Sequence, residues 1–246
     1  MSPSNGIAIL CLGCLVPTLR ADDPKTKSID AGTISAYEKI GAKYGGFFVD
    51  KTGFLLFGAG EKAAGLWTPG FGFTEELPGG KLPKLPPVDV PFGLIFVQSG
   101  LSDEGLKELK ELKNLKFLNL TGTVVTNEGL KEMKNLKSLR ALSLNGTRVT
   151  DEGMKELKEL KNLASLNLNG TKVGDKGLKE LKDLPDLKFL FLGSTKVTDA
   201  VVSELRHLEN LQVLSLGSTE VTVAISTTKQ LQELVLRSVL FAVHSL

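Results

Sequence analysis

The sequence predicts an α/β protein built as a right-handed solenoid, with parallel strands on its concave side and short helices on its convex side. Three observations predict this fold. Columns of leucine, glycine and threonine recur at one fixed interval, the hydrophobic period changes within each interval, and the residues before the repeats differ in composition. A repeat of this length is typical of stacked units that bury one continuous core between neighbours.

The interval is 24 residues, and it holds over most of the chain. One unit reads L-x-x-L-x-L-x-x-T-x-V-T-D-x-G-L-x-x-L-x-x-L. The first recognisable strand covers residues 93–96, one interval before Leu118 and Leu120. The last covers residues 233–236 and arrives four residues early, so this final unit should lack a proper helix. The glycine column is Gly105, Gly129, Gly153 and Gly177, and the threonine column is Thr123, Thr147, Thr171, Thr195 and Thr219.

Each unit contains a strand followed by a helix. Leu118 and Leu120 alternate with outward residues, which predicts a short strand with one buried face. Thr126 is a candidate N-cap, and polar and acidic residues follow it at the positive end of the expected helix. Leu130 and Met133 then begin a stripe of apolar residues spaced by three. A single unit cannot bury these side chains alone, so stacking is required.

These columns resemble the leucine-rich repeat proteins, in the ribonuclease-inhibitor-like form whose unit carries Thr after the strand and "VTDEGL" at the helix entry. The resemblance covers about residues 91–236. It implies a concave parallel sheet and a non-catalytic role in binding other proteins. Many repeats of the family carry Asn where this chain has Thr123 and its equivalents. A threonine hydroxyl can also bond the exposed backbone of the turn, so it is expected to keep the ladder role of that asparagine.

Residues 22–90 are expected to form an N-terminal α+β cap, because most of the aromatic residues lie between Tyr44 and Phe92. A solenoid needs such a cap to cover its terminal leucines. The pattern predicts a helix over residues 33–45, a hairpin of residues 45–50 and 53–58, and a proline-rich lead-in over residues 77–91. "EKIGAKYGGFFVD" and "PPVDVPFGL" also resemble the segment before the repeats in secreted planctomycete proteins of this kind.

Residues 1–21 are interpreted as a signal peptide, since the apolar run at residues 6–16 is too short to span a membrane. Export to the periplasm or the extracellular space is therefore expected; without a signal peptide the protein would be cytoplasmic. A lipoprotein box ending at Cys14 and a buried apolar N-terminus are the alternatives. Residues 91–246 are expected to form the repeat solenoid with an irregular last repeat, and they end on apolar residues without a visible cap.

The sequence offers little chemistry for catalysis. His207 and His244 are isolated, and no cysteine follows Cys14, so neither a catalytic residue nor a cofactor or metal site is predicted. "FGAGEKA" mimics a dinucleotide-binding turn, but a hairpin exit is the simpler interpretation. A net charge of +2 gives no reason to expect nucleic acid. Lysine columns on the convex side run beside glutamate columns, and these opposite charges should pair.

The expected binding surface is the concave sheet, at the positions that flank the strand leucines. Most of these positions are small or polar, as on an exposed sheet. Phe189 and Phe191 are the exception, and with Val213 beside them they predict an apolar patch with a polar rim. Alternatively, the cap or the C-terminus folds over this patch. The candidate partner-binding residues are Phe117, Asn119, Thr121, Arg140, Ser143, Asn145, Asn167, Asn169, Phe189, Phe191, Gln212, Val213 and Ser215.

The functional expectation is a scaffold that captures an unidentified protein partner by rigid complementarity, with the two phenylalanines as anchors. No nucleic acid and no membrane span are expected. The second hypothesis is a structural repeat protein that self-associates through its C-terminal edge. An enzyme is the third, and it would need a catalytic site within the cap.

Overall fold

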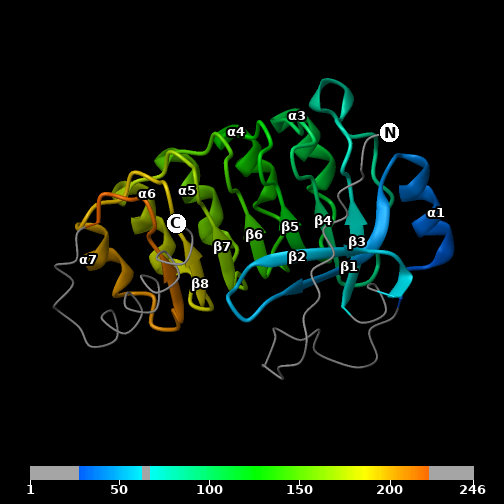
Figure 1. The fold of residues 1–246 in the computed structure, drawn as a ribbon. Coiled ribbons are helices and arrows are strands. Elements are labelled where there is room, and N and C mark those ends of the chain that lie inside the picture. Colours follow the sequence, from blue (N-terminus) through cyan, green and yellow to red (C-terminus); the bar gives the residue numbers. More distant parts are fainter. Residues whose placement is uncertain (1–27, 63–66, 222–246) are drawn as a thin grey trace, which may run out of the picture.

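The computed structural model describes residues 28–62 and 67–221, and it confirms the α/β solenoid. Parallel strands on one side alternate with short helices on the other, and together they form a curved row (Figure 1). Each strand is paired in parallel with the next. The repeat strands are β4 (Phe92–Ile95), β5 (Leu115–Asn119), β6 (Ala141–Ser143), β7 (Ser165–Asn167), β8 (Phe189–Phe191) and β9 (Val213–Ser215).

The helix of each repeat is a single turn of α-helix, and in most repeats it tightens into a 3-10 turn. A 3-10 helix has three residues per turn, which explains why the apolar stripe recurs every three residues. The α-helical turns are α3 (Asp103–Leu106), α4 (Asn127–Leu130), α5 (Asp151–Met154), α6 (Asp175–Leu178) and α7 (Val201–Leu205). The 3-10 turns are η2 (Lys107–Leu109), η3 (Lys131–Met133), η4 (Lys155–Glu159) and η5 (Lys179–Asp183).

The repeat leucines form one continuous core between the strands and the helices. At the turn after each strand, the threonine of the repeat is buried or half-buried, and its hydroxyl donates a hydrogen bond to the leucine carbonyl three residues earlier. The hydroxyl therefore bonds the backbone of its own turn, as expected, but the ladder role expected of it is wrong. It does not join one repeat to the next.

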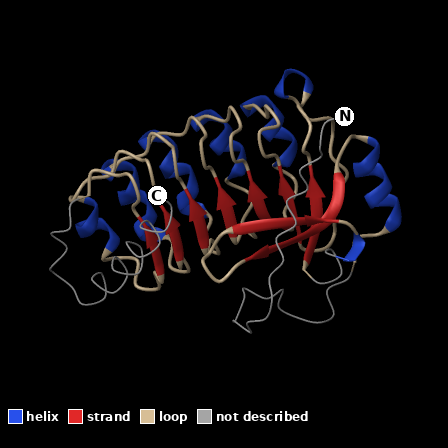
Figure 2. Ribbon diagram, in the orientation of Figure 1, coloured by secondary structure: helices blue, strands red, loops and turns tan. Residues whose placement is uncertain are grey.

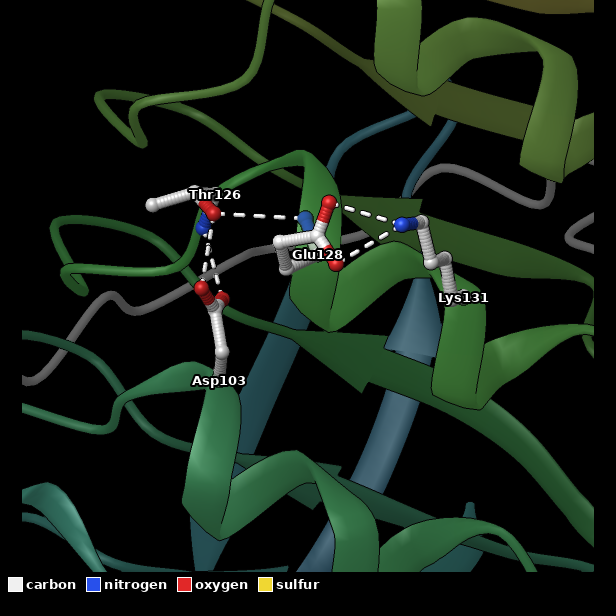
Figure 3. Close-up of polar contacts among 4 residues, drawn as sticks. All are labelled: Asp103, Thr126, Glu128 and Lys131. Carbon is white, nitrogen blue, oxygen red and sulfur yellow. Dashed lines mark hydrogen bonds and ion pairs between the residues drawn. The ribbon is translucent and has the colours of Figure 1, made fainter.

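A different side chain joins neighbouring repeats on the convex side. Asp103 accepts hydrogen bonds from the N–H and the hydroxyl of Thr126 at 2.8 and 2.6 Å, and the Thr126 hydroxyl caps α4 by accepting from the N–H of Glu128 (Figure 3). In the following repeats, the N–H groups of Thr150, Gly174 and Thr198 donate the equivalent bond to a side-chain oxygen of the preceding repeat. This recurring contact, which we call the helix-entry ladder, aligns successive helices. Its acceptors are Asp103, Asn127, Asp151 and Asp175.

The N-terminal cap continues the same sheet. It contains α1 (Ala31–Lys39), β1 (Lys43–Val49), β2 (Leu55–Ala59), β3 (Thr68–Gly72) and the 3-10 turn η1 (Pro78–Gly80). The helix expected over residues 33–45 is shorter than predicted, because Gly41 adopts a φ of +90° and β1 begins two residues later. Strand β3, which the sequence did not predict, pairs in parallel with β4. The cap thus adds its own strand to the open edge.

The predicted hairpin is confirmed as the pair β1 and β2, but it does not lie beside the solenoid. Strand β1 pairs antiparallel with β3 through Lys43–Phe47, and with β2 through Gly45–Val49. Beyond this shared pairing, both strands cross in front of the parallel strands of the repeats (Figure 2). The hairpin therefore reaches over the concave face.

Several sequence-based expectations lie outside the described residues. These are the signal peptide, the lipoprotein box, the shortened last repeat, the apolar C-terminal edge and His244. Within residues 28–62 and 67–221, no helix has the length and hydropathy needed to cross a membrane.

Candidate functional site

The concave face presents its outward side chains in straight rows, because adjacent parallel strands are paired in register. In the first row, Phe117 is opposite Ala141, followed by Ser165, Phe189 and Val213. In the second row, Asn119 is opposite Ser143, followed by Asn167, Phe191 and Ser215. These rows are the ones that the sequence predicts.

The hairpin packs on the first row through an apolar cluster. Phe47 and Val49 of β1 are buried together with Phe117 and Ala141, and Leu55 and Phe57 of β2 pack at its border. Phe47 also lies directly on Gly93 of β4, where an added Cβ atom would come within 2.5 Å of its ring. The missing side chain at Gly93 thus makes room for the hairpin on the sheet.

The turn at the tip of the hairpin is held by Asp50. Its carboxylate oxygen Oδ1 accepts hydrogen bonds from the N–H groups of Thr52 and Phe54 at 2.8 and 3.0 Å, and from the Thr52 hydroxyl at 2.6 Å. Gly53 adopts a φ of +93°. This left-handed backbone favours glycine, so the sequence of the turn fixes its shape.

The tip is seated on strands β7 and β8. The carbonyl of Gly53 accepts a hydrogen bond from the Ser165 hydroxyl at 2.7 Å, and the ring of Phe54 stacks on that of Phe191 with 4.3 Å between centroids. An added Cβ atom at Gly53 would lie 2.3 Å from the ring of Phe189. The backbone of the turn therefore fits closely against the two phenylalanines.

The expectation that Phe189 and Phe191 are exposed is wrong. Their exposed fractions are 9% and 2%, because the hairpin turn covers them. Of the two alternatives weighed from the sequence, folding of the cap over the patch is the one that the structure contains. Six candidate binding residues are buried in this way: Phe117, Asn119, Ser143, Asn167, Phe189 and Phe191.

The other seven candidate residues retain access to solvent. Thr121, Asn145 and Asn169 form a half-exposed third row at the ends of β5, β6 and β7. Val213 and Ser215 of β9 lie beyond the hairpin tip and are half-exposed. Arg140, just before β6, is also half-exposed, and Gln212 is exposed. We call Thr121, Asn145, Asn169, Val213 and Ser215 the open concave surface.

Phe54 is the functional candidate that sequence reasoning missed. Its exposed fraction is 40%, and Val124 is the only other large hydrophobic residue that is comparably exposed among the described residues. The sequence predicts an exposed aromatic ring at Phe191. In the structure, the exposed ring is that of Phe54, which stacks on Phe191. The available signal was the joint presence of outward phenylalanines in a polar row and an aromatic hairpin in the cap.

A small pocket lies between the hairpin and the second and third rows. Its volume is about 170 Å³. Phe54, Leu55 and Leu56 contribute apolar groups from the hairpin, and the strands contribute mainly amides and hydroxyls. Among the described residues that line it, none is charged. The strand residues at the pocket include Asn119, Thr121, Ser143, Asn145 and Asn167.

The remaining candidate features are accounted for by the fold. Among the described residues, strand β2 pairs only with β1, and the pairing is antiparallel. The turn at Gly60 therefore ends a hairpin, whereas a dinucleotide site requires parallel strand pairing. His207 is exposed, as predicted. On the convex side, lysines and glutamates form ion pairs, including Lys107 with Glu104 and Lys137 with Glu159.

Known proteins place this architecture in a family. Residues 96–242 match the family described as "Leucine-rich repeat region", which is more than half of the chain. The chain belongs to the leucine-rich repeat family. The repeats of this family are typical of protein-interaction scaffolds, whose curvature creates extended concave binding surfaces. No curated protein matches the chain.

Two similar solved structures are internalins from Listeria monocytogenes str. 4b F2365. Internalin C2 has 28% sequence identity over 50% of this chain and 50% of that one, with a TM-score of 0.45. Internalin inlF has 21% identity over 52% of this chain and 48% of that one, with a TM-score of 0.36. The chain thus spans about half the length of these internalins.

Proposed function

We propose that this leucine-rich repeat protein is a non-catalytic scaffold, and that it binds a protein partner on its concave side at and beyond the hairpin tip. The observation that carries the proposal is the position of Phe54. It is a 40% exposed aromatic residue on a rigid support, because its ring rests on Phe191 and its backbone is fixed by Asp50. Aromatic residues held in this way are frequent anchors of protein interfaces.

The surroundings of Phe54 suit the centre of an interface. Val213 is half-exposed and follows Phe189 in the register of the first row, so it continues the apolar area beyond the tip. Asn169 and Ser215 supply polar groups at its border. An apolar centre with a polar rim is the usual composition of such surfaces. Because the strands are already ordered, little conformational entropy would be lost on binding.

In this proposal, the buried candidates Phe117, Phe189 and Phe191 act as supports of the hairpin, and the open concave surface makes the direct contacts. Arg140 and Gln212 lie at the start of their strands and extend the rim on that side. The proposal includes export of the protein, for which the apolar segment at residues 6–16 is the argument. Determining the N-terminal residue of the mature protein would test export separately.

The binding test uses two substitutions of matched exposure. The full-length protein is used as bait in native extract, with Phe54→Asp compared against Val124→Asp, whose side chain is 38% exposed in the turn after β5. We expect Phe54→Asp to lose the captured protein and Val124→Asp to retain it. Equal capture by both variants would overturn the proposed surface.

A second measurement separates loss of binding from loss of structure. A photo-crosslinking residue at Val213 should form an adduct with the captured protein, while the same residue at Lys158, on the convex side, should not. Thermal unfolding of each variant is followed in parallel. Crosslinking from Lys158 alone would place the partner on the convex face and contradict the proposal.

A further inference from the structure

The pocket between the hairpin and the strands is lined by two buried side-chain amides whose oxygens are hydrogen-bonded and whose nitrogens are not. Asn119 and Asn167 each have an exposed fraction of only 8%. Their Oδ1 atoms accept hydrogen bonds from the N–H groups of Thr121 and Asn169, both at 3.0 Å. These bonds fix the orientation of each amide and direct its Nδ2 group away from the turn.

Neither Nδ2 group has a hydrogen-bond acceptor among the described residues. A buried amide donor without a partner costs free energy, so such groups normally reach water or a ligand. In the part of the chain that the structure describes, no side-chain nitrogen or oxygen is fully enclosed without a partner. Both Nδ2 groups therefore reach solvent, and both residues line the pocket beside the hairpin.

The two donors are regularly spaced. Asn119, Ser143 and Asn167 are opposite one another on adjacent strands, so the two amides are separated by two strand spacings, or about 10 Å. Between them, the hydroxyl of Ser143 shares a hydrogen bond with that of Thr121 at 2.9 Å. Asn145 is half-exposed and makes no side-chain hydrogen bond within the described chain, so its amide offers both a donor and an acceptor.

The composition of the pocket restricts the chemistry of its ligand. A charged ligand would lose hydration without meeting an opposite charge. A purely apolar ligand would leave the donors of Asn119 and Asn167 unpaired. The ligand must be uncharged, must accept and donate several hydrogen bonds on one side, and must present an apolar face to Phe54 and Leu56 on the other.

We infer that this pocket binds one ring of a neutral sugar. A pyranose has hydroxyl groups that both donate and accept, and its C–H face can stack on an aromatic ring. One face of Phe54 packs on Phe191, and its exposed fraction leaves ring surface for such a contact. The volume of about 170 Å³ is far above what one water molecule requires and leaves room for a small ligand such as a single sugar ring.

This site borders the proposed protein-binding surface and shares Phe54, Thr121 and Asn145 with it. The inference stands on Asn119 and Asn167 beneath the hairpin, which the proposed protein contacts do not use. Failure of protein capture would leave the sugar site standing, and failure of sugar binding would leave the proposed function standing.

The test measures saturation transfer by NMR from the full chain to glucose, galactose, mannose and N-acetylglucosamine. Glucuronate serves as the charged comparison. We expect transfer to the ring C–H protons of at least one neutral sugar, and weaker transfer to glucuronate. Absence of transfer to all four neutral sugars, or stronger transfer to glucuronate, would overturn the inference.

Isosteric variants then identify the site. Asn119→Asp and Asn167→Asp keep the oxygen that holds the turn but replace the Nδ2 donor with an acceptor, so each should weaken sugar binding at least tenfold. Asn162→Asp is the matched control, because its Nδ2 donates to the Lys137 carbonyl outside the pocket. Unchanged binding in Asn167→Asp would contradict the assignment.

Two further arms keep the result interpretable. Should either aspartate variant unfold at a lower temperature, Asn145→Ala replaces it, since the Asn145 side chain has no hydrogen bond within the described chain to lose. Asn145→Ala should also weaken binding. An acetylated, uncharged Gly-Ser peptide is tested beside the sugars; binding of this peptide in place of the sugars, with the same dependence on Asn167, would reject the sugar and assign the pocket to peptides.

Discussion

On the convex side, each repeat is joined to the next by a contact that recurs once per interval, whereas on the concave side one hairpin reaches from β4 to β8. The helix-entry ladder repeats with Asp103, Asn127, Asp151 and Asp175. The hairpin tip instead makes contacts that do not recur, among them the bond between Gly53 and Ser165. The difference separates what holds the solenoid together from what decides which part of its sheet is accessible.

The largest effect is expected from a core leucine that both sides share. Leu166→Ala removes a fully buried side chain between β7 and the helices and should lower the free energy of unfolding by about 2–5 kcal/mol. Leu55→Ala, the same change on the half-buried face of the hairpin, should cost clearly less. Denaturant unfolding measures both. Equal losses would mean that the hairpin is as integral to stability as the repeat core.

The ladder should come next. Asp103→Ala removes an acceptor of two hydrogen bonds at the Thr126 N-cap, and hydrogen bonds to a charged group contribute about 1.5–3 kcal/mol each at most. We expect a loss of about 2 kcal/mol. Lys131→Ala is the control on the same helix, since its ion pair with Glu128 is exposed and should not change the unfolding midpoint measurably (Figure 3). A larger effect of Lys131→Ala would contradict this ranking.

Gly53→Ala tests the hairpin tip. The new methyl group would collide with Phe189 and would require a left-handed backbone, so the tip should lift from the sheet. We expect a global loss of only about 1–2 kcal/mol, because the repeats keep their own contacts. Hydrogen exchange should accelerate at residues 50–56 and remain unchanged in the helices. Unchanged exchange at the tip would show that the turn accommodates the methyl group in place.

The smallest effect is expected at Tyr37, in the core of the cap. Its hydroxyl donates to the Pro86 carbonyl at 3.0 Å and its ring stacks on Phe71, so Tyr37→Phe should cost about 1 kcal/mol at neutral pH. Burial raises the pKa of this phenol far above its usual value. The unfolded chain therefore loses its proton first as the pH rises past about 10, and stability falls there. Tyr37→Phe should flatten that fall in unfolding midpoints measured between pH 8 and 11.

The repeats could be predicted from the sequence because each position recurs in an equivalent environment. Leu118, Leu142 and Leu166 occupy the same buried position in three successive repeats. Thr126 indicates the start of its helix because threonine is a favoured N-cap residue. The hairpin could also be predicted as a local element, from the apolar runs on either side of Lys51 and Thr52. Its position on the sheet could not, since it depends on contacts outside the repeat pattern, such as the bond between Gly53 and Ser165, which are 112 residues apart.

For the same reason, the candidate site was predicted only in part. The rows follow from the interval, so Asn119, Ser143 and Asn167 were placed correctly next to one another. Their accessibility depends on what covers them, and a strand pattern shows which side chains point outward without showing whether water reaches them. Phe191 and Phe54 illustrate this. Phe191 points outward from its strand but is buried, whereas Phe54, which covers it, has the exposed ring.

The bond from Gly53 to Ser165 also bears on how the chain is made. A row of repeats can fold as each unit leaves the ribosome, since a unit needs only its predecessor. The hairpin tip must instead wait for a partner 112 residues later, which at 5–20 residues per second takes about 6 to 22 s. During that interval the side chains of the hairpin that face the sheet, including Phe47 and Phe57, lack part of the strands on which the hairpin packs. The bond that fixes the hairpin tip in the finished molecule thus cannot form until Ser165 has been synthesised.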